Sequence, residues 1–148
     1  ENLALGSLWS GMALANAGLG AVHGFAGPVG GMFPAPHGAV CAALLPHVMA
    51  ANLKALRERN PQSPLLTRYE KLSALLTNSA TAPADVGVNW VQTLVGDISI
   101  PKLSSYGIRE EHIPDIVTKA ANASSMKANP IPLTPEELTE VLQRAAGL

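Results

Sequence analysis

The chain contains the stretch Val22-His23-Gly24-Phe25-Ala26-Gly27-Pro28-Val29-Gly30-Gly31-Met32-Phe33-Pro34-Ala35-Pro36-His37-Gly38, in which two histidines stand fourteen residues apart among small and apolar residues. No residue from Asn2 to Leu53 carries a full charge. A neutral imidazole is the commonest metal ligand in proteins, and glycine lets the backbone approach a bound group closely. The stretch could supply half of a divalent metal site, with His23 and His37 as two of its ligands. On these residues alone, two histidines in an apolar region are more often core or interface residues, each hydrogen-bonded to a carbonyl group or to water.

Apolar spacing predicts helices on both sides of this stretch. The expected helices in the first part of the chain cover residues 3–17, 19–32 and 37–59, the last of them bent at Pro46. Each glycine inside the second helix costs about 1 kcal/mol relative to alanine. We therefore expect this helix to be stabilised by close packing against its neighbours.

The second part of the chain also has the pattern of helices separated by turns. A helix is expected over residues 65–76, another after residues 81–85 that stops before Pro101, and another from Glu110 to about Ala121, after a turn at residues 104–107. The last helix is the best specified, because Thr134 and Glu137 form a capping box around Pro135. With no series of strands and no repeat, the sequence predicts an all-α fold.

Residues 16–48 resemble the central signature of the iron-containing (group III) alcohol dehydrogenases, and residues 126–138 resemble the closing segment of that family. The resemblance implies a helical bundle like the C-terminal, dehydroquinate synthase-like domain of the family, formed by residues 1–148 as a single domain. The family takes its other two metal ligands from an Asp-x-x-x-His turn, and no Asp of this chain has a His four residues later. The chain is therefore expected to be a fragment that lacks the N-terminal nucleotide-binding domain and the first helix of the helical domain.

The resemblance also implies a function for the complete protein, which is a metal-dependent, NAD(P)-linked alcohol dehydrogenase or aldehyde reductase. His23 and His37 match two ligands of Fe²⁺, or of Zn²⁺ in its place, while NAD(P) is bound mainly by the absent N-terminal domain. Phe25, Gly27 and Ser125 match positions that line the pocket, and Gly27 stands where many members carry a further histidine. A small alcohol or aldehyde substrate, a dimeric assembly and a cytoplasmic location follow from the same resemblance. The isolated chain is expected to be inactive.

Three other side chains could take part in metal binding, and each has a simpler interpretation. His47 lies about 280° around the helix from His37 and is expected to be a packing or surface residue. Cys41 shares a helix face with His37, but a lone cysteine is more often a small hydrophobe than a zinc ligand. His112, beside two glutamates at a helix start, is expected to be exposed to solvent.

Composition limits the remaining classes of function. The chain has 148 residues, of which 47% are hydrophobic and 14% charged, and this apolar surface favours a partner domain or subunit. A net charge of −1 without a basic cluster argues against nucleic-acid binding, and a single cysteine allows no intrachain disulfide.

Two other classes of protein were weighed against an enzyme fragment. A helical oligomerisation or interaction module without catalysis would use the same apolar surface and would bind no metal. A membrane span over residues 3–22 would need about 20 apolar residues, but Ser7, Ser10 and Asn16 interrupt this segment and Asn2 directly precedes it. No Lys or Arg flanks it before Lys54, so the usual anchors are absent and we expect no membrane contact.

Overall fold

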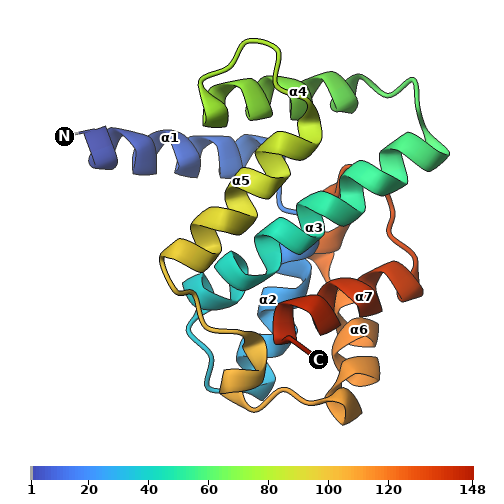
Figure 1. Ribbon diagram of the computed structural model, residues 1–148. Helices are drawn as coiled ribbons and strands as arrows, with labels where there is room; N and C mark the ends of the chain where they lie inside the picture. The colour runs from blue at the N-terminus through green and yellow to red at the C-terminus, as the bar shows by residue number, and fades with distance from the viewer. Residues whose placement is uncertain (1) are drawn as a thin grey trace.

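The computed structural model describes residues 2–148, and this part of the chain consists of helices joined by short connections (Figure 1). The predicted all-α fold is thereby confirmed. The α-helices and 3₁₀ turns are α1 (Asn2–Ala17), α2 (Ala21–Met32), α3 (His37–Arg59), α4 (Pro64–Thr77), α5 (Ala84–Asp97), η1 (Leu103–Tyr106), η2 (Glu110–His112), α6 (Ile113–Ala121), η3 (Ser124–Ala128) and α7 (Pro135–Ala146).

Helix α3 runs through the middle of the molecule and belongs to both clusters of buried apolar side chains (Figure 1). Its first half, with Val40 and Leu44, packs into a cluster formed with α2, α6 and α7. Its second half, with Met49 and Leu53, packs against α5, which α4 covers in turn. One helix therefore links the two halves of the core.

Among residues 2–148, α3 is also the helix with enough length and hydropathy to cross a membrane, with a mean hydropathy of 1.5 over its best window. The segment at residues 3–22 that sequence analysis considered does not pass the same test. Of that window in α3, 56% is buried inside the protein. A helix that packs against neighbours on several sides has the composition of a core helix, which accounts for its hydropathy.

Helix α2 forms despite four glycines and an internal proline because one of those glycines allows close packing. A Cβ atom on Gly24 would lie 2.7 Å from the Met126 side chain and 3.5 Å from the Ala120 carbonyl oxygen. Gly24 therefore leaves room for the end of the Met126 side chain, which would have to move if a larger residue stood here. This contact is an example of the close packing that is expected to offset the cost of the glycines to helix stability.

Helices α4 and α5 meet at a contact that sequence periodicity did not indicate. Ser73 of α4 is fully buried, and its hydroxyl donates a hydrogen bond to the carbonyl oxygen of Pro83 at 2.6 Å. Gly87 of α5 lies directly against Ser73, whereas the neighbouring Leu72 is 39% exposed. The absence of a side chain on Gly87 draws Ser73 into the interface.

Helix α1 has the opposite character, because none of its described residues is buried. Leu3, Leu8, Trp9 and Met12 are among the most exposed large apolar side chains of the molecule. The helix extends away from the other elements toward the N-terminus (Figure 1). Residues 2–148 leave most of these apolar side chains exposed, while Leu14, near the C-terminal end of α1, lines a hollow together with residues of α2 and α3.

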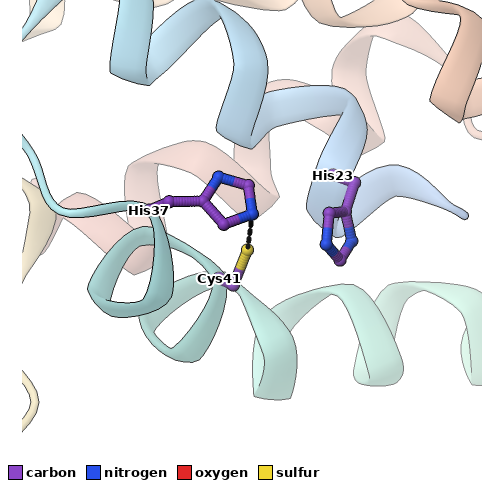
Figure 2. Close-up of side chains that lie close together, drawn as sticks. All are labelled: His23, His37 and Cys41. Carbon is purple, nitrogen blue, oxygen red and sulfur yellow. Dashed lines mark hydrogen bonds between the residues drawn. The ribbon is translucent and has the colours of Figure 1, made fainter. Parts of the chain in front are cut away.

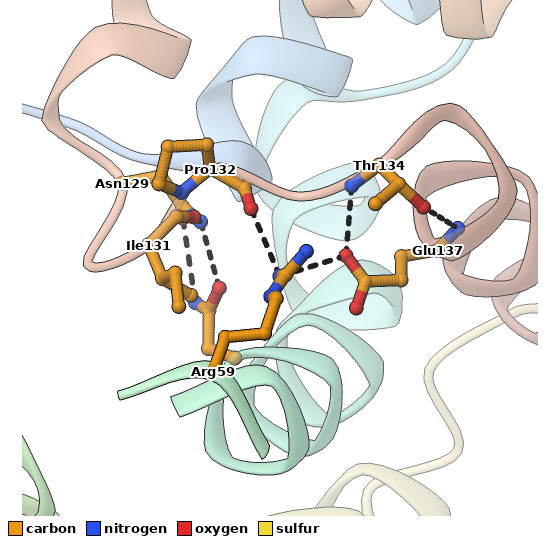
Figure 3. A network of polar contacts seen from close by, with 7 residues as sticks. Arg59, Asn129, Ile131, Pro132, Thr134 and Glu137 are labelled. Carbon is orange, nitrogen blue, oxygen red and sulfur yellow. Dashed lines mark hydrogen bonds and ion pairs between the residues drawn. The ribbon is translucent and has the colours of Figure 1, made fainter. Parts of the chain in front are cut away.

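Two expected features near the C-terminus have different outcomes. The capping box is confirmed, with the Glu137 amide donating to Thr134 Oγ1 at 3.2 Å and the Thr134 amide donating to Glu137 Oε2 at 2.7 Å (Figure 3). The single helix expected from Glu110 to Ala121 is wrong in detail, because the chain forms the 3₁₀ turn η2 before α6 begins at Ile113. Pro114 in the first turn of α6 has no N–H, which favours such a break.

The contact between α4 and α5 predicts opposite effects for two glycines of the same helix. In Gly87→Ala the new Cβ would lie 2.7 Å from Ser73 Cα and 2.9 Å from its Cβ, so backbone must shift and the free energy of unfolding should fall by about 1–3 kcal/mol. In Gly96→Ala nothing lies within 4 Å, and stability should be unchanged or rise by up to about 1 kcal/mol. Urea unfolding of both variants tests this, and equal stability of Gly87→Ala and wild type would contradict it.

Candidate metal centre

The structure brings together the two predicted ligands and Cys41, for which the sequence favours a role as a small hydrophobic residue. His23 lies in the first turn of α2, His37 is the first residue of α3, and Cys41 follows one turn later on α3. One potential ligand atom from each of the three lies within 4.8 Å of the others. Figure 2 shows His23 reaching from α2 toward the face of α3 that carries His37 and Cys41.

The geometry within this cluster is that of side chains in contact. The ring centroids of His23 and His37 are 5.3 Å apart with the planes tilted by 50°. His37 Nε2 and Cys41 Sγ are 3.5 Å apart, a hydrogen-bonding distance for sulfur in which the tautomer of His37 decides the donor (Figure 2). The three polar atoms face one another in a region of otherwise apolar side chains.

Burial shifts the pKa values of His23 and Cys41, the two partly buried residues of the cluster, in opposite directions. The pKa of His23 is lowered, first by desolvation and then by the neighbouring His37, so the neutral imidazole is favoured. The pKa of the Cys41 thiol is raised by burial. A neutral imidazole offers a free lone pair to a metal, while a thiol must lose its proton to become a ligand.

The prolines between α2 and α3 fix where His37 lies. Pro34 and Pro36 have no N–H, and Pro36 adopts an extended conformation directly before α3. A helix cannot continue through this connection, so His37 begins a new one. His23 and His37 are thereby held on two separate helices that pack against each other.

A polar joint holds the start of α2 on the other side. Asn129 Oδ1 accepts hydrogen bonds from the Ala21 amide at 3.0 Å and from Asn52 Nδ2 at 3.3 Å. Asn129 Nδ2 donates to Asn52 Oδ1 and to the Ile131 carbonyl oxygen, both at 2.7 Å (Figure 3). Asn52 is only 3% exposed, so this pair of side-chain amides is protected from water. The pair connects α3 and the segment before α7 to Ala21 of α2, which stands two residues before His23.

Beside the cluster lies a hollow of about 400 Å³ with an apolar lining. His23 and Cys41 form part of its wall, and the other residues that line it come from the end of α1, from α2 and from α3: Leu14, Gly18, Leu19, Gly20, Val22, Ala42 and Leu45. The ligand atoms therefore lie at the edge of a space that could take a small apolar group.

The three residues predicted to line a pocket lie in different surroundings. Phe25 is fully buried in the core cluster of α2, and Gly27 is exposed with nothing within 4 Å of a Cβ built on it. Ser125 is half-buried in η3, which packs against α2. Gly27 thus has open space where a larger side chain would fit, and a role for any of the three in a pocket stays a prediction.

The other two histidines lie outside the cluster. His47 is half-buried near Arg144, and its pKa is lowered by burial and then by that charge, in agreement with the expected packing role. His112 was expected to be exposed, but it is half-buried: its ring stands edge-on to Phe33 at 5.1 Å, and its Nδ1 accepts a hydrogen bond from the Arg109 amide at 3.1 Å. The turn η2 brings His112 against Phe33, which directly follows α2. A single helix from Glu110 to Ala121 does not predict this contact.

Cys41 is the member of the cluster that sequence reasoning set aside. The signal was present, because a four-residue spacing places Cys41 on the same helix face as His37. What the sequence could not give was the approach of His23 from another helix. Two imidazole nitrogens and one thiol are a donor set that suits zinc or iron, and the group contains no carboxylate among residues 2–148.

The comparisons with known proteins concern the chain as a whole. The model of the Fe-containing alcohol dehydrogenase family, C-terminal, matches residues 1–146. The chain is 34% identical to lactaldehyde reductase of Escherichia coli K12 and 34% identical to 1,3-propanediol dehydrogenase of Citrobacter freundii, in each case over 98% of this chain and 37% of the relative.

Solved structures give the same result for the fold. A crystal structure of 1,3-propanediol oxidoreductase superposes with a TM-score of 0.80 and 31% identity, over 94% of this chain and 36% of that one. An iron-containing alcohol dehydrogenase of Thermococcus thioreducens superposes with a TM-score of 0.72 at 24% identity, over 93% of this chain and 34% of that one, and supports the fold alone. The chain therefore spans little more than a third of the length of the relatives that it matches.

The polar joint at the start of α2 predicts a specific loss. Asn129→Ala removes the acceptor of the Ala21 amide and leaves the buried Asn52 unpaired, so stability should fall by about 1–3 kcal/mol and exchange of the Ala21 amide hydrogen should accelerate. Asn122→Ala is the matched control, because Asn122 is exposed and bonds only the Thr118 carbonyl within its own helix. Native-state hydrogen exchange by NMR measures both, and unchanged protection of Ala21 in Asn129→Ala would contradict the role of the joint.

Proposed function

Because this chain belongs to the Fe-containing alcohol dehydrogenase family, we propose that it is the helical, metal-holding part of a metal-dependent, NAD(P)-linked alcohol dehydrogenase or aldehyde reductase. In this proposal His23 and His37 are two of the metal ligands, and α2 and α3 form one wall of the active-site cleft. The single observation that carries the proposal is the convergence of His23 and His37 from separate helices beside an apolar hollow.

The chemistry of the two histidines supports this role. Burial and then the neighbouring His37 lower the pKa of His23, which favours the neutral imidazole with a ring nitrogen free to bind a cation. Because α2 and α3 are held by core packing and the Asn129 joint, the two imidazoles are positioned before any metal arrives. When bound, a divalent iron or zinc ion polarises the substrate oxygen, and NAD(P) carries the hydride.

The surroundings of the histidines support a small substrate. The hollow beside them is lined mainly by apolar residues, which suits the carbon chain of a small alcohol or aldehyde and excludes water from one side. Gly27 presents no side chain, so a proton relay through a histidine at this position is excluded for this chain. NAD(P) is bound mainly by an N-terminal domain outside this chain, in the part of the relatives that the chain does not span.

The family relationship also leads us to propose a dimeric, cytoplasmic complete protein in which the nucleotide-binding domain and the preceding helix complete the cleft. The exposed apolar face of α1 supports a partner of some kind, since such side chains are usually covered. The isolated chain should show no dehydrogenase activity, because it spans only about 37% of its relatives and has only one wall of the cleft.

The ligand role predicts metal binding by the isolated chain. In an anaerobic titration with ferrous and zinc ions, wild type should bind about one metal per chain, and His23→Ala/His37→Ala should lose that binding because both imidazole donors are gone. His47→Ala is the control and should bind as wild type does. Binding that the double variant retains would overturn the assignment and favour a helical interaction module.

The catalytic role can be tested by exchange of the matching segments. A chimera in which this chain replaces the matching 37% of the Escherichia coli lactaldehyde reductase should reduce lactaldehyde with a nicotinamide cofactor. Either His23→Ala or His37→Ala in the chimera should lower kcat/KM by at least about 100-fold, while His47→Ala should leave it nearly unchanged. Full activity of the histidine variants would contradict the proposal.

A further inference from the structure

Most of the large side chains of α1 gather on one side of the helix. At about 100° per residue, the side that we call the outer face of α1 consists of Leu5, Leu8, Trp9 and Met12. Each of these four side chains is between 43% and 62% exposed. The opposite side carries Leu3, Gly6, Ser7, Ser10, Gly11 and Leu14. Because Leu14 lines the hollow beside His23, the outer face is turned away from that hollow.

The spacing of the outer face is that of a helix-packing surface. Counted from Leu5, its other members follow at three, four and seven residues, which is the pattern by which one helix packs against another. No residue of α1 carries a charge, whereas a helix with one side in water usually has charged residues on that side. The outer face of α1 therefore suits an apolar helix better than it suits solvent.

The connection to α2 fixes only one end of α1. Gly18 has a φ of +76°, and a Cβ atom built on it would lie 3.0 Å from Ala128 Cβ, so the connection is packed against η3. No described residue of α1 itself is buried. Leu14 stands one turn before Gly18, and its carbonyl oxygen accepts a hydrogen bond from the Gly18 amide at 3.2 Å. The direction in which α1 leaves this connection therefore decides where Leu14 stands in the wall of the hollow.

The family relationship indicates what covers the outer face. The family model matches residues 1–146 and therefore includes α1. In the superposition on 1,3-propanediol oxidoreductase, which covers 94% of this chain, the unmatched residues are fewer than the 16 of α1, so at least part of α1 has a counterpart there. That match takes up only 36% of the oxidoreductase chain. A segment of the same polypeptide is present at high effective concentration, which favours it over a second copy as the partner of α1.

We propose that the outer face of α1 is the docking surface for an apolar helix from the N-terminal part of the complete protein, and that this docking sets the wall of the hollow beside His23. The inference rests on the proposed function, which includes such a part. Helices α2 and α3, which carry His23 and His37, are held by the core and by Asn129 and do not depend on α1. Docking therefore acts on the space for the substrate and not on the metal ligands.

Hydrogen exchange shows directly whether α1 is covered. Mass spectrometry of peptides, in a buffer with a metal chelator, compares the isolated chain with the chimera that carries the N-terminal part of the Escherichia coli lactaldehyde reductase. We expect the amides of α1 to exchange at least about 100-fold more slowly in the chimera, because a covered helix is shielded from water. The amides of α3, which the core already protects in the isolated chain, are the internal reference. Fast exchange of α1 in the chimera would overturn the docking surface.

A variant of Leu8 tests the outer face itself. Leu8 is 60% exposed, so Leu8→Ala should leave the stability of the isolated chain nearly unchanged. In the chimera it should speed exchange of the α1 amides by at least about 10-fold, because the docked helix loses a contact. It should also raise KM for lactaldehyde by at least about 5-fold with a smaller change in kcat, since the hollow is disturbed and the metal is not.

The control for this variant is Lys71→Ala, at an exposed charged residue of α4. It should change neither the exchange of α1 nor KM. Unchanged exchange of α1 in Leu8→Ala would overturn the docking surface, and unchanged KM would overturn its link to the hollow. Circular dichroism identifies a variant that fails to fold, and the exchange measurement on the chimera itself needs no variant.

The outcomes separate this inference from the proposed function, because the exchange measurement needs neither metal nor activity. A chimera with a protected α1 but no dehydrogenase activity would support the docking surface and contradict the proposed function. An active chimera in which α1 exchanges rapidly would overturn the docking surface and leave the proposed function intact. Protection of α1 that is lost when the chimera is diluted to a monomer would assign the outer face to a second copy and overturn the inference.

Discussion

The burial of α3 on opposite sides is the constraint on which the rest of this structure depends. Its first half is enclosed by α2, α6 and α7, and its second half by α5 with α4 behind it. Neither cluster includes the whole helix, so the two halves of α3 are held in place by different sets of neighbours. His37 and Cys41 lie in the first turns of α3. Their side chains are therefore held by a packed helix, which positions them more precisely than a loop would.

The opposite wall of the site depends on two quite different contacts. At Gly24 the side chain of Met126 lies against α2, and Asn129 fixes the first turn of α2 by a hydrogen bond to Ala21. The amide of Asn129 is paired with the buried Asn52 of α3, which connects the start of α2 to the middle of the central helix. The position of His23 therefore depends on Gly24, which leaves room for Met126 beside α2, and on the Asn129–Asn52 pair, which fixes the start of α2 relative to α3.

Sequence alone was sufficient for the fold class and for most helix bounds, because helical spacing, prolines and the capping box at Thr134 are local signals. The structure brings the rings of His23 and His37 to 5.3 Å from each other, and their role as metal ligands stays a prediction. The sequence did not predict the burial of side chains that depends on contact with a residue of another helix or turn. Ser73 is buried because Gly87 meets it, and His112 is half-buried because Phe33 covers it. The place of Cys41 beside both histidines was missed for the same reason, since only the approach of His23 turns a pair of residues on one helix into a group of three.

The full exposure of α1 has a thermodynamic consequence for its own helix–coil equilibrium. Starting a helix is unfavourable, and isolated helices shorter than about 12–15 residues are marginal in water even when rich in alanine, a length that α1 exceeds only slightly. With 16 residues, none of them buried, α1 receives no help from the core and contains no ion pair to strengthen it. Its helical population is therefore set by what covers its apolar side chains, and on warming it frays well before α3 does.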